Sequence, residues 1–373
     1  MKIKNISHCC LIGALAGCLS FPASCAAAQD NFLLRTAPYS EEELDDVFGE
    51  LPRYFDLGSF TLNQLNNIPI ATLTDSGMIV SGKDTAYLIR YPWNILETLL
   101  ARRLEKQEGD WGLYIKDLNT GNVIEINEHA MESASLIKLF IAGTTLELIE
   151  KGELDETETI TSALHEMITV SDNESSNVLV RSFIEEGAEF QKGLDIVNAF
   201  NQEYGFTNTE QVNGIADPSL WVSDGRVNIT SPADCGRFLE MVYNRELVSH
   251  YASYRLEELL NHQEVNYKIP SALPEGTWIS HKTGEVDDTE NDAAIIYTPQ
   301  GDYIFCIMST DLYDTGSAVD TIREITKKVY NWFTKPIIEL DPVTLTPLHE
   351  EDQAAVSTEI SDAEENYEEE YYW

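Results

Sequence analysis

Ser135 and Lys138 lie three residues apart in the segment MESASLIKLF, which has the apolar pattern of a buried helix. Residues three apart on a helix share a face, so Lys138 can reach the hydroxyl of Ser135. A serine hydroxyl becomes a good nucleophile when a base removes its proton, and a buried lysine with a lowered pKa is such a base. The alternative is a chance pairing in which the ammonium of Lys138 extends to solvent.

Two further segments carry residues suited to the same chemistry. In TVSDNESSN, Ser171 and Asn173 interrupt a helical pattern and could relay a proton and bind a substrate amide, or simply form part of a helix cap. In SHKTGEVDD, Lys282 and Thr283 stand at the end of a predicted strand, where a cation and a hydroxyl can hold a carboxylate. Gly284 lets the backbone approach closely, although an ordinary turn at the strand end is the simpler reading.

Taken in this order, the segments S-x-x-K, S-D-N and K-T-G resemble the motifs of class A β-lactamases and penicillin-binding proteins. The surrounding sequence is also similar, most closely over YKIPSALPEGTWISHKTGEVDDTENDAAIIYTPQGDYIFCIM, and the resemblance covers roughly residues 91–335. It implies an α+β fold of the β-lactamase type, with a five-stranded antiparallel sheet flanked by helices and an all-helical lobe. The site would lie in the cleft between the lobe and the sheet.

The resemblance implies a role for each motif residue. Ser135 would attack a carbonyl and form an acyl-enzyme, Lys138 would help to activate it, and Ser171 would relay a proton to the leaving nitrogen. Lys282 would bind the substrate carboxylate together with Thr283, and would also lower the pKa of Lys138. The other positions expected at the substrate are Asn173, which would bind an amide, Gly284, and the backbone N–H groups of Ser135 and Glu285, which would form the oxyanion hole.

Release of the acyl group is where the sequence departs from the family pattern. In β-lactamases a glutamate in the loop before TSP, with an asparagine four residues later, activates the hydrolytic water. Here Glu210 has Asn213 three residues later, and counting back from Pro232 places the family position near residues 215–217, where only Asp217 is acidic. Asp217 and Glu210 are the two candidates for the deacylation base, and neither fits the pattern.

A second departure concerns the shape of the cleft. Ser135 and Ser171 are 36 residues apart, which is fewer than is usual in class A enzymes. The missing residues include a loop that walls one side of the cleft in that family. We therefore expect a more open site on that side.

The implied function is that of an exported serine hydrolase that opens β-lactams, or related amides and esters, through an acyl-Ser135 intermediate. Two alternatives stay open: a penicillin-reactive cell-wall peptidase or esterase with slow deacylation, and a catalytically silent binding module of the cell envelope. The expected partner is a small β-lactam or a cell-wall peptide, and the chain is expected to be a monomer. No cofactor or metal is expected, because the seven histidines are scattered and His165-Glu166 lacks the second histidine of H-E-x-x-H.

The formal net charge of −40 argues against a nucleic-acid partner and against anionic membrane surfaces, both of which need clustered Lys and Arg. Apolar residues make up 43% of the 373 residues, which indicates a largely globular chain. Only Cys235 and Cys306 lie beyond the predicted export signal. The sequence favours two separate buried thiols over a disulfide, and the pairing stays open.

Four segments follow from the composition along the chain. Residues 1–28 have a basic start and a short apolar stretch typical of an export signal cleaved after Ala28, although LAGC resembles a lipoprotein box that would anchor the chain at Cys18. Either route places the protein outside the cytoplasm, secreted or attached to the cell envelope. The other three segments are a spacer or accessory segment at 29–90, the catalytic domain at 91–336 and an acidic disordered tail at 337–373.

Within the predicted catalytic domain the helical and strand patterns alternate in blocks. We expect a helix from Trp93, a hairpin turning at NTG, a long helix ending near Gly152 and two helical runs broken at SDN. A helix should follow SPAD, and TWISHKTG, DAAIIYTPQ and DYIFCIMST should be successive strands before a last helix. Strands at both ends with helices between them indicate an α+β layout.

Overall fold

The computed structural model describes residues 33–36, 70–74, 77–81, 86–222, 225–336 and 338–349. The export signal, Cys18 and residues 350–373 of the expected tail therefore lie outside the described residues. The chain divides into two compact units, one formed by Met1–Thr98 with Lys335–Trp373 and the other by Leu99–Thr334. Within the described residues, no helix is both long enough and apolar enough to span a bilayer.

The first unit contains a five-stranded sheet in the order β1-β2-β3-β4-β12. β12 pairs with β4, and Ile338 and Leu340 pack with Ala86 and Leu88 in a small apolar cluster. Residues 338–340 were expected to belong to a disordered tail. They pair with β4 instead, because alternate apolar side chains can be buried even in a strand of three residues. The strands of this sheet are β1 (Leu33–Thr36), β2 (Ile70–Thr74), β3 (Gly77–Ser81), β4 (Ala86–Ile89) and β12 (Ile338–Leu340).

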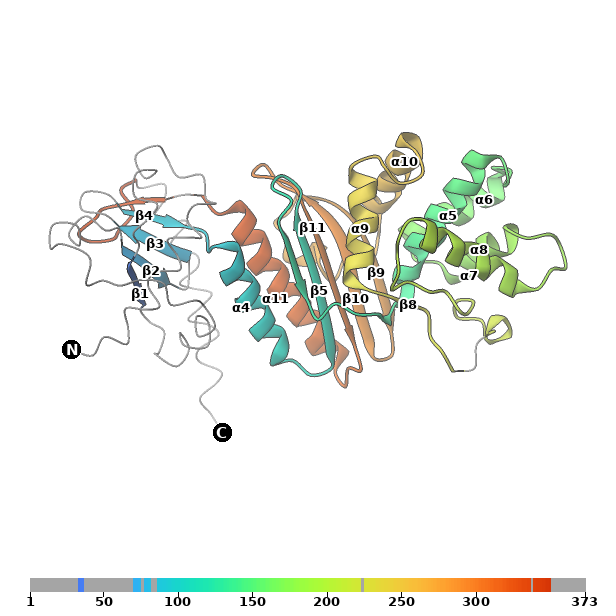
Figure 1. Ribbon diagram of the computed structural model, residues 1–373, viewed down its shortest axis with the longest axis horizontal. Coiled ribbons are helices and arrows are strands. Elements are labelled where there is room, and N and C mark those ends of the chain that lie inside the picture. The colour runs from blue at the N-terminus through green and yellow to red at the C-terminus, as the bar shows by residue number, and fades with distance from the viewer. Residues whose placement is uncertain are drawn as a thin grey trace. The chain divides into compact units, whose positions relative to one another are not determined.

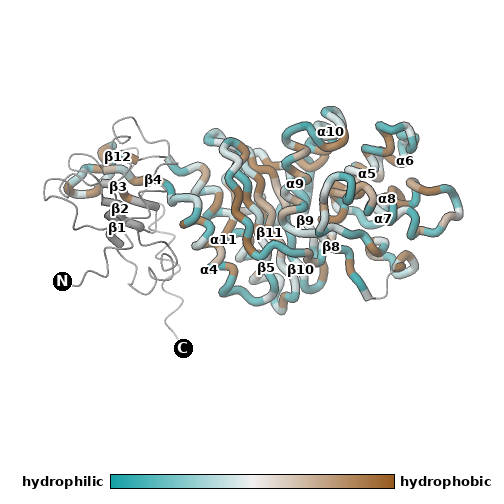
Figure 2. Tube along the Cα trace, in the orientation of Figure 1, coloured by the Kyte–Doolittle hydropathy of each residue, from teal (hydrophilic) through white to brown (hydrophobic). Residues whose placement is uncertain are grey.

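The second unit is built on a five-stranded antiparallel sheet in the order β6-β5-β11-β10-β9, which confirms the predicted fold class. The hairpin at NTG is confirmed, with Gly121 in the left-handed region at φ 76°. Hydrophobic residues concentrate in the central strands (Figure 2). The strands are β5 (Asp110–Asp117), β6 (Val123–Ile126), β9 (Trp278–Val286), β10 (Thr289–Tyr297) and β11 (Tyr303–Thr310).

Helices cover both faces of this sheet (Figure 1). α4 (Trp93–Glu105) and α11 (Thr315–Thr334) lie side by side on one face, where Arg103 and Glu324 form an ion pair at 2.6 Å. α9 (Pro232–Tyr243) packs on the other face, and a Cβ at Gly236 would come within 2.4 Å of the ring of Tyr114 on β5. The first and last predicted helices therefore cover one face, as expected.

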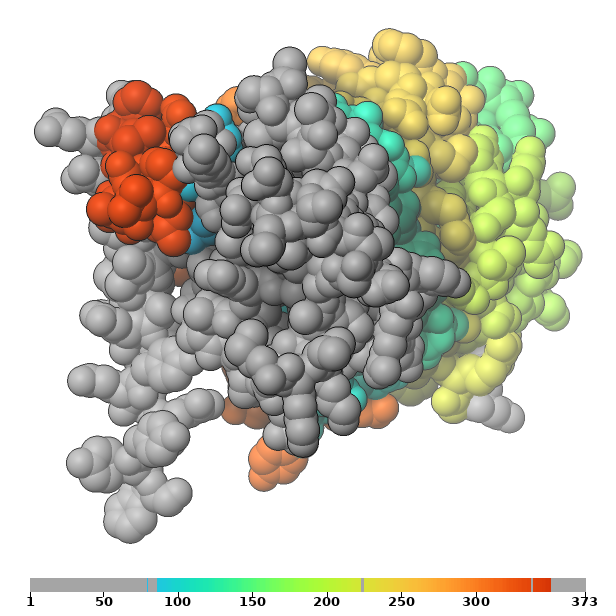
Figure 3. All heavy atoms as spheres, turned by 60° about the vertical axis from the view of Figure 1, so that its left-hand side comes forward, coloured from blue at the N-terminus to red at the C-terminus, as the bar shows by residue number. Residues whose placement is uncertain are grey.

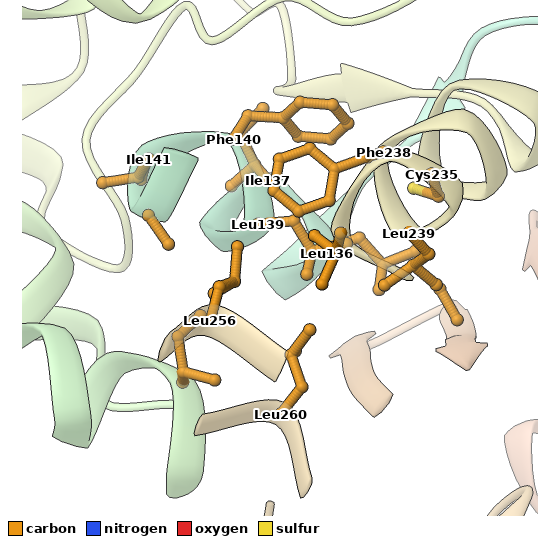
Figure 4. Packing of buried hydrophobic residues seen from close by; sticks show 14 of the residues in the cluster. Leu136, Ile137, Leu139, Phe140, Ile141, Cys235, Phe238, Leu239, Leu256 and Leu260 are labelled. Atoms are coloured by element: carbon orange, nitrogen blue, oxygen red, sulfur yellow. The ribbon is translucent and has the colours of Figure 1, made fainter. Parts of the chain in front are cut away.

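The helical lobe is organised around α5 (Ile137–Lys151), of which twelve residues are buried. A helix that is apolar on all sides needs neighbours on all sides. Phe140 stacks edge-on against Phe206 and Phe238 at ring-centroid distances of 5.1 and 5.2 Å, and Figure 4 shows α5 residues facing Phe238, Leu256 and Leu260. The surrounding helices are α6 (Glu158–Thr169), α7 (Asn173–Ser182), α8 (Phe190–Glu203) and α10 (His250–Asn261).

Helix boundaries in the lobe follow the sequence signals. α5 ends at Gly152, which adopts φ 70°, and the side chains of Thr157, Asp172 and Ser249 cap the N-termini of α6, α7 and α10. The gold residues of α9 and α10 lie against the green residues of the lobe in the space-filling view (Figure 3).

Cys235 and Cys306 are both buried and unpaired, so the prediction of two separate thiols is confirmed. The remaining elements are β7 (Met131–Glu132), η5 (Ala134–Leu136), η6 (Pro218–Leu220), β8 (Ile229–Thr230) and η7 (Pro270–Ala272).

Candidate active site

Ser135 occupies a single 3₁₀ turn, η5, that leads directly into α5. Ala134 enters this turn with φ 43°, a backbone conformation that non-glycine residues rarely adopt. Ser135 is half-buried, and its N–H belongs to the first turn, where N–H groups have no partner within the helix. The serine is thus presented just before the N-terminus of α5, the end of a helix that favours negative charge.

Strand β9 lies directly against this turn. A Cβ placed on Gly284 would come within 3.1 Å of the backbone nitrogen of Ser135 and 2.9 Å of the carbonyl oxygen of Ser133. Only glycine fits here without moving the turn, which gives a physical reason for the glycine of K-T-G. β9 is also the edge strand of the sheet, so alternate N–H groups along it, expected to include that of Glu285, have no partner strand.

Lys138 is completely buried and is the second residue of α5. Its ammonium donates to the carbonyl oxygen of Ser171 at 2.6 Å, to Asn173 Oδ1 at 2.7 Å and to Ser171 Oγ at 3.2 Å. Among the described residues it has no hydrogen bond to Ser135, which lies in the 3₁₀ turn η5 and not, as expected, in the same helix. Burial lowers the pKa of Lys138 to about 7, and the nearby carboxylate of Asp172 opposes this shift.

Ser171 joins the three motifs. It lies between α6 and α7 with φ 59°, a strained conformation of the kind that concentrates at functional sites. Lys282 donates to its Oγ at 2.8 Å, and Lys138 approaches the same oxygen. Asp172 caps α7 by accepting from the N–H of Ser175 at 2.6 Å, so the helix-cap reading of this segment holds alongside its place in the site.

The positive charge of Lys138 disfavours protonation of Lys282. Lys282 is completely buried, and its pKa is lowered well below the ordinary value, first by burial and then by the charge of Lys138. The resemblance implied that the charge of Lys282 lowers the pKa of Lys138; in the structure, burial is the main cause of the lowered pKa of both lysines. The second hydrogen bond of Lys282 goes to the carbonyl oxygen of Thr283 at 2.8 Å, which fixes the lysine along β9.

Neither candidate for the deacylation base joins this group of residues. The carboxylate of Asp217 caps η6 through the N–H and hydroxyl of Ser219, at 2.9 and 2.7 Å, and lies 3.8 Å from Arg181. Glu210 pairs with Arg226 at 3.0 Å. Within the described residues, no hydrogen bond or ion pair of Asp217 or Glu210 reaches Ser135, Lys138 or Ser171. A cavity of about 400 Å³ lies beside Glu210, lined by residues of α8 and of the 210–226 segment, and no S-x-x-K, S-D-N or K-T-G residue lines it.

Asn177, which the sequence did not single out, fixes the backbone of the loop that contains residue 215. The amide of Asn177 donates to the carbonyl oxygen of Ile215 and accepts from its N–H, both at 2.9 Å. Asn177 is four residues after Asn173 on α7, so the two share a face. Ile215 is therefore held beside the helix face that carries Asn173. Asn177, the second asparagine of SDNESSN, was visible in the sequence. Its partner could not be predicted, because the contact depends on how the loop containing Ile215 packs against α7.

Glu285, expected to contribute only its backbone, has a half-exposed carboxylate at the end of β9. It accepts a hydrogen bond from the hydroxyl of Tyr267. Thr283 is buried two residues earlier on the same strand. The structure thus brings Lys138, Ser171, Asn173 and Lys282 into one hydrogen-bonded group and places Gly284 against Ser135.

Comparison with known proteins agrees with this arrangement. The model of the β-lactamase enzyme family matches residues 94–163 and 159–333. A comparison with curated protein sequences finds no match.

Solved structures with the same fold include PBP-A, with 23% identity over 65% of this chain and 96% of that chain and a TM-score of 0.58. A β-lactamase from Sphaerobacter thermophilus is 18% identical over 64% of this chain and 96% of its own, with a TM-score of 0.55. An ancestral class A β-lactamase is 20% identical over 63% of this chain and 99% of its own, with a TM-score of 0.54. The chain belongs to the β-lactamase enzyme family and is a serine hydrolase.

Proposed function

We propose that the protein forms a covalent acyl-enzyme on Ser135 with penicillins, or with related cell-wall amides and esters, and that it releases the acyl group slowly. The observation that carries the proposal is the hydrogen-bonded group around Ser171, in which two buried lysines meet one hydroxyl. Of the alternatives left open by the sequence, slow release is favoured because Asn177 of α7 holds the backbone of Ile215, while the carboxylates of Asp217 and Glu210 are engaged by other side chains.

Acylation would begin with attack of Ser135 Oγ on the substrate carbonyl while its proton passes to the neutral amine of Lys138. A pKa of about 7 leaves a large fraction of Lys138 neutral under ordinary conditions. The carbonyl π electrons move to oxygen, where the N–H groups of Ser135 and Glu285 would stabilise the negative charge. Each donor of this kind is worth roughly 3–4 kcal/mol in a serine protease.

Collapse of the tetrahedral intermediate breaks the C–N bond. Ser171 is suited to protonate the leaving nitrogen, because its Oγ contacts two lysines from which it can recover a proton. Lys138 donates to Oδ1 of Asn173, so the NH₂ group of Asn173 is left to donate to a substrate carbonyl. Lys282 and Thr283 would hold the substrate carboxylate on β9.

Hydrolysis of the ester needs a base to activate water. The carboxylates of Asp217 and Glu210 are engaged by Ser219, Arg181 and Arg226, so they are poorly placed to supply it. One structure of the same fold is that of a PBP-A variant as an acyl-enzyme complex with penicillin G, which supports penicillin as a first probe. We also propose that the chain acts outside the cytoplasm; the basic and apolar pattern of residues 1–28 supports this.

Intact mass spectrometry after mixing with penicillin G tests the proposal. We expect the mass to rise by that of one intact penicillin, because acylation opens the ring without loss of atoms, and the adduct to outlast many times its own formation. Ser135→Ala should give no adduct, and Ser182→Ala, on α7 away from the motifs, is the matched control that should react normally. Absence of an adduct without turnover would refute the proposal, and rapid turnover without an adduct would refute slow release.

A further inference from the structure

Lys268 is a completely buried lysine that belongs to none of the three motifs. It precedes η7, and its ammonium donates to the carbonyl oxygens of Gly284 at 2.9 Å and Asn291 at 3.1 Å and pairs with the carboxylate of Glu290 at 2.6 Å. An ammonium has three N–H donors, so these three acceptors use all of them. Lys268 has no donor left for a substrate carboxylate, which argues for a role inside the protein.

The two carbonyl groups held by Lys268 face each other across the sheet. Gly284 of β9 and Asn291 of β10 are partners in the strand register. Two carbonyl oxygens brought together repel each other unless a cation lies between them. Lys268 therefore fixes β9 against β10 at the glycine of K-T-G, immediately before the N–H of Glu285.

Asn291 connects the same point to the turn that carries Ser135. Its side-chain amide donates to the carbonyl oxygens of Glu132 at 3.0 Å and Ser133 at 3.3 Å, and its Oδ1 accepts from the N–H of Ser309 at 3.0 Å. Asn291 is completely buried, so these bonds are not exchanged with water. The amide thereby holds the two residues that lead into η5 against β10 and β11.

The two expected oxyanion donors belong to different segments, Ser135 to η5 and Glu285 to β9. Lys268 holds β9 through the carbonyl oxygen of Gly284, and the side chain of Asn291 holds the residues before η5. The two contacts are linked because Lys268 also binds the backbone carbonyl oxygen of Asn291. The segments are close enough that a Cβ on Gly284 would meet the nitrogen of Ser135 at 3.1 Å. Oxyanion donors act only within a narrow range of distances, and a displacement of about 1 Å can cost roughly a hundredfold in rate.

We propose that Lys268 and Asn291 are positioning residues that set the separation of the two N–H groups of the oxyanion hole. This inference rests on the proposed acylation of Ser135 and adds to it two residues outside the motifs. The charge is necessary because no neutral side chain of similar shape can donate to two carbonyl oxygens and a carboxylate at once.

The test compares Lys268→Met, the double variant Lys268→Met/Glu290→Gln and Asn291→Ala with the wild-type protein. The double variant removes the carboxylate that Lys268→Met would leave buried without its partner, which protects the fold. The matched control is Lys116→Met/Glu240→Gln, since Lys116 and Glu240 form a half-buried ion pair at 2.5 Å between β5 and α9. All variants are first checked for cooperative unfolding by circular dichroism.

Two quantities are measured: the maximal acylation rate at saturating penicillin G, and the infrared stretching frequency of the acyl-enzyme carbonyl. We expect the rate to fall roughly ten- to a hundredfold in the Lys268 and Asn291 variants, with little change in the half-saturating concentration. The carbonyl frequency should rise, because poorly placed N–H donors polarise the bond less. The control pair should change neither quantity.

An unchanged carbonyl frequency in folded Lys268 and Asn291 variants would overturn the inference and leave the proposed function intact. A rise in the half-saturating concentration alone would also overturn it, because that result would assign Lys268 to substrate binding. Failure of the wild-type protein to form any adduct would refute the proposed function, and this inference with it.

Discussion

The rate at which Ser135 is acylated should follow the protonation state of Lys138. Lys138 can accept the serine proton only when neutral, and burial lowers its pKa to about 7. The neutral fraction is then about 3% at pH 5.5 and about 97% at pH 8.5, so the maximal acylation rate should rise roughly 30-fold over this interval. Activity is lost as the pH falls through about 7 and is retained above it.

Asp172 allows the cause of this midpoint to be tested. Its carboxylate stabilises the charged form of Lys138 and so raises the pKa of that lysine. Asp172→Asn removes the charge and retains a side chain that can cap α7, since Asn is as good a cap as Asp. The midpoint of the pH profile should therefore move to lower pH. Asp195→Asn, an exposed change on α8, is the matched control and should leave the midpoint unchanged.

The assay is rapid quenching of the reaction with penicillin G followed by intact mass, at pH values from 5 to 9. Saturating penicillin is used because titration of Lys282 should change the affinity for the carboxylate rather than the maximal rate. A flat profile, or a midpoint near the ordinary lysine pKa of 10.5, would refute Lys138 as the base. A midpoint that rises in Asp172→Asn would refute the assigned electrostatics.

Four further substitutions test other parts of the structure. Ile215→Glu should speed loss of the acyl group roughly a hundredfold, because it places a carboxylate on the loop that Asn177 holds; decay of the adduct mass measures this rate. Asp217→Asn should leave the decay unchanged. A slower decay in Asp217→Asn would show that Asp217 activates the hydrolytic water. Gly284→Ala should slow acylation about a hundredfold, because the new Cβ would lie 2.9 Å from the carbonyl oxygen of Ser133; a normal rate would show that β9 can move. Phe140→Ala should lower the free energy of unfolding by about 3–5 kcal/mol in denaturant titrations, since Phe140 is fully buried between two other rings; a loss below about 1 kcal/mol would contradict the packing described for α5.

Several helices and strands of the second unit could be predicted from the sequence because their signals are local. The helix of Lys138 was recognisable from its apolar neighbours, its end from Gly152, and the turn between β5 and β6 from NTG. Ser135, Lys138 and Asn173 lie at the starts of helical elements whose type could be predicted. Lys282 and Thr283, expected at a strand end, lie instead in the middle of β9, because the strand continues through Gly284 to Val286 in its pairing with β10. By contrast, β1 to β4 and β12 are strands of three to five residues without a clear alternation of apolar and polar residues. Their sheet could therefore not be predicted from the sequence.

The hydrogen bonds within the site could not be predicted from spacing. Ser135 and Lys138 are three residues apart, yet Lys138 donates to Ser171 and Asn173 because the α6–α7 connection lies against it. The roles of Lys268 and Asn291 depend on a strand register that brings distant residues together. The position of Ile215 depends on two bonds from Asn177 that no count along the chain reveals.

The central claim is that Ser135 accepts an acyl group faster than the protein can release it. The most direct measurement is the ring opening of penicillin G followed from the first milliseconds with enzyme and substrate at comparable concentrations. The account predicts a burst of about one ring opened per protein molecule, followed by a much slower steady rate, with no burst in Ser135→Ala. Fast steady turnover without a burst, or a burst that survives in Ser135→Ala, would contradict it.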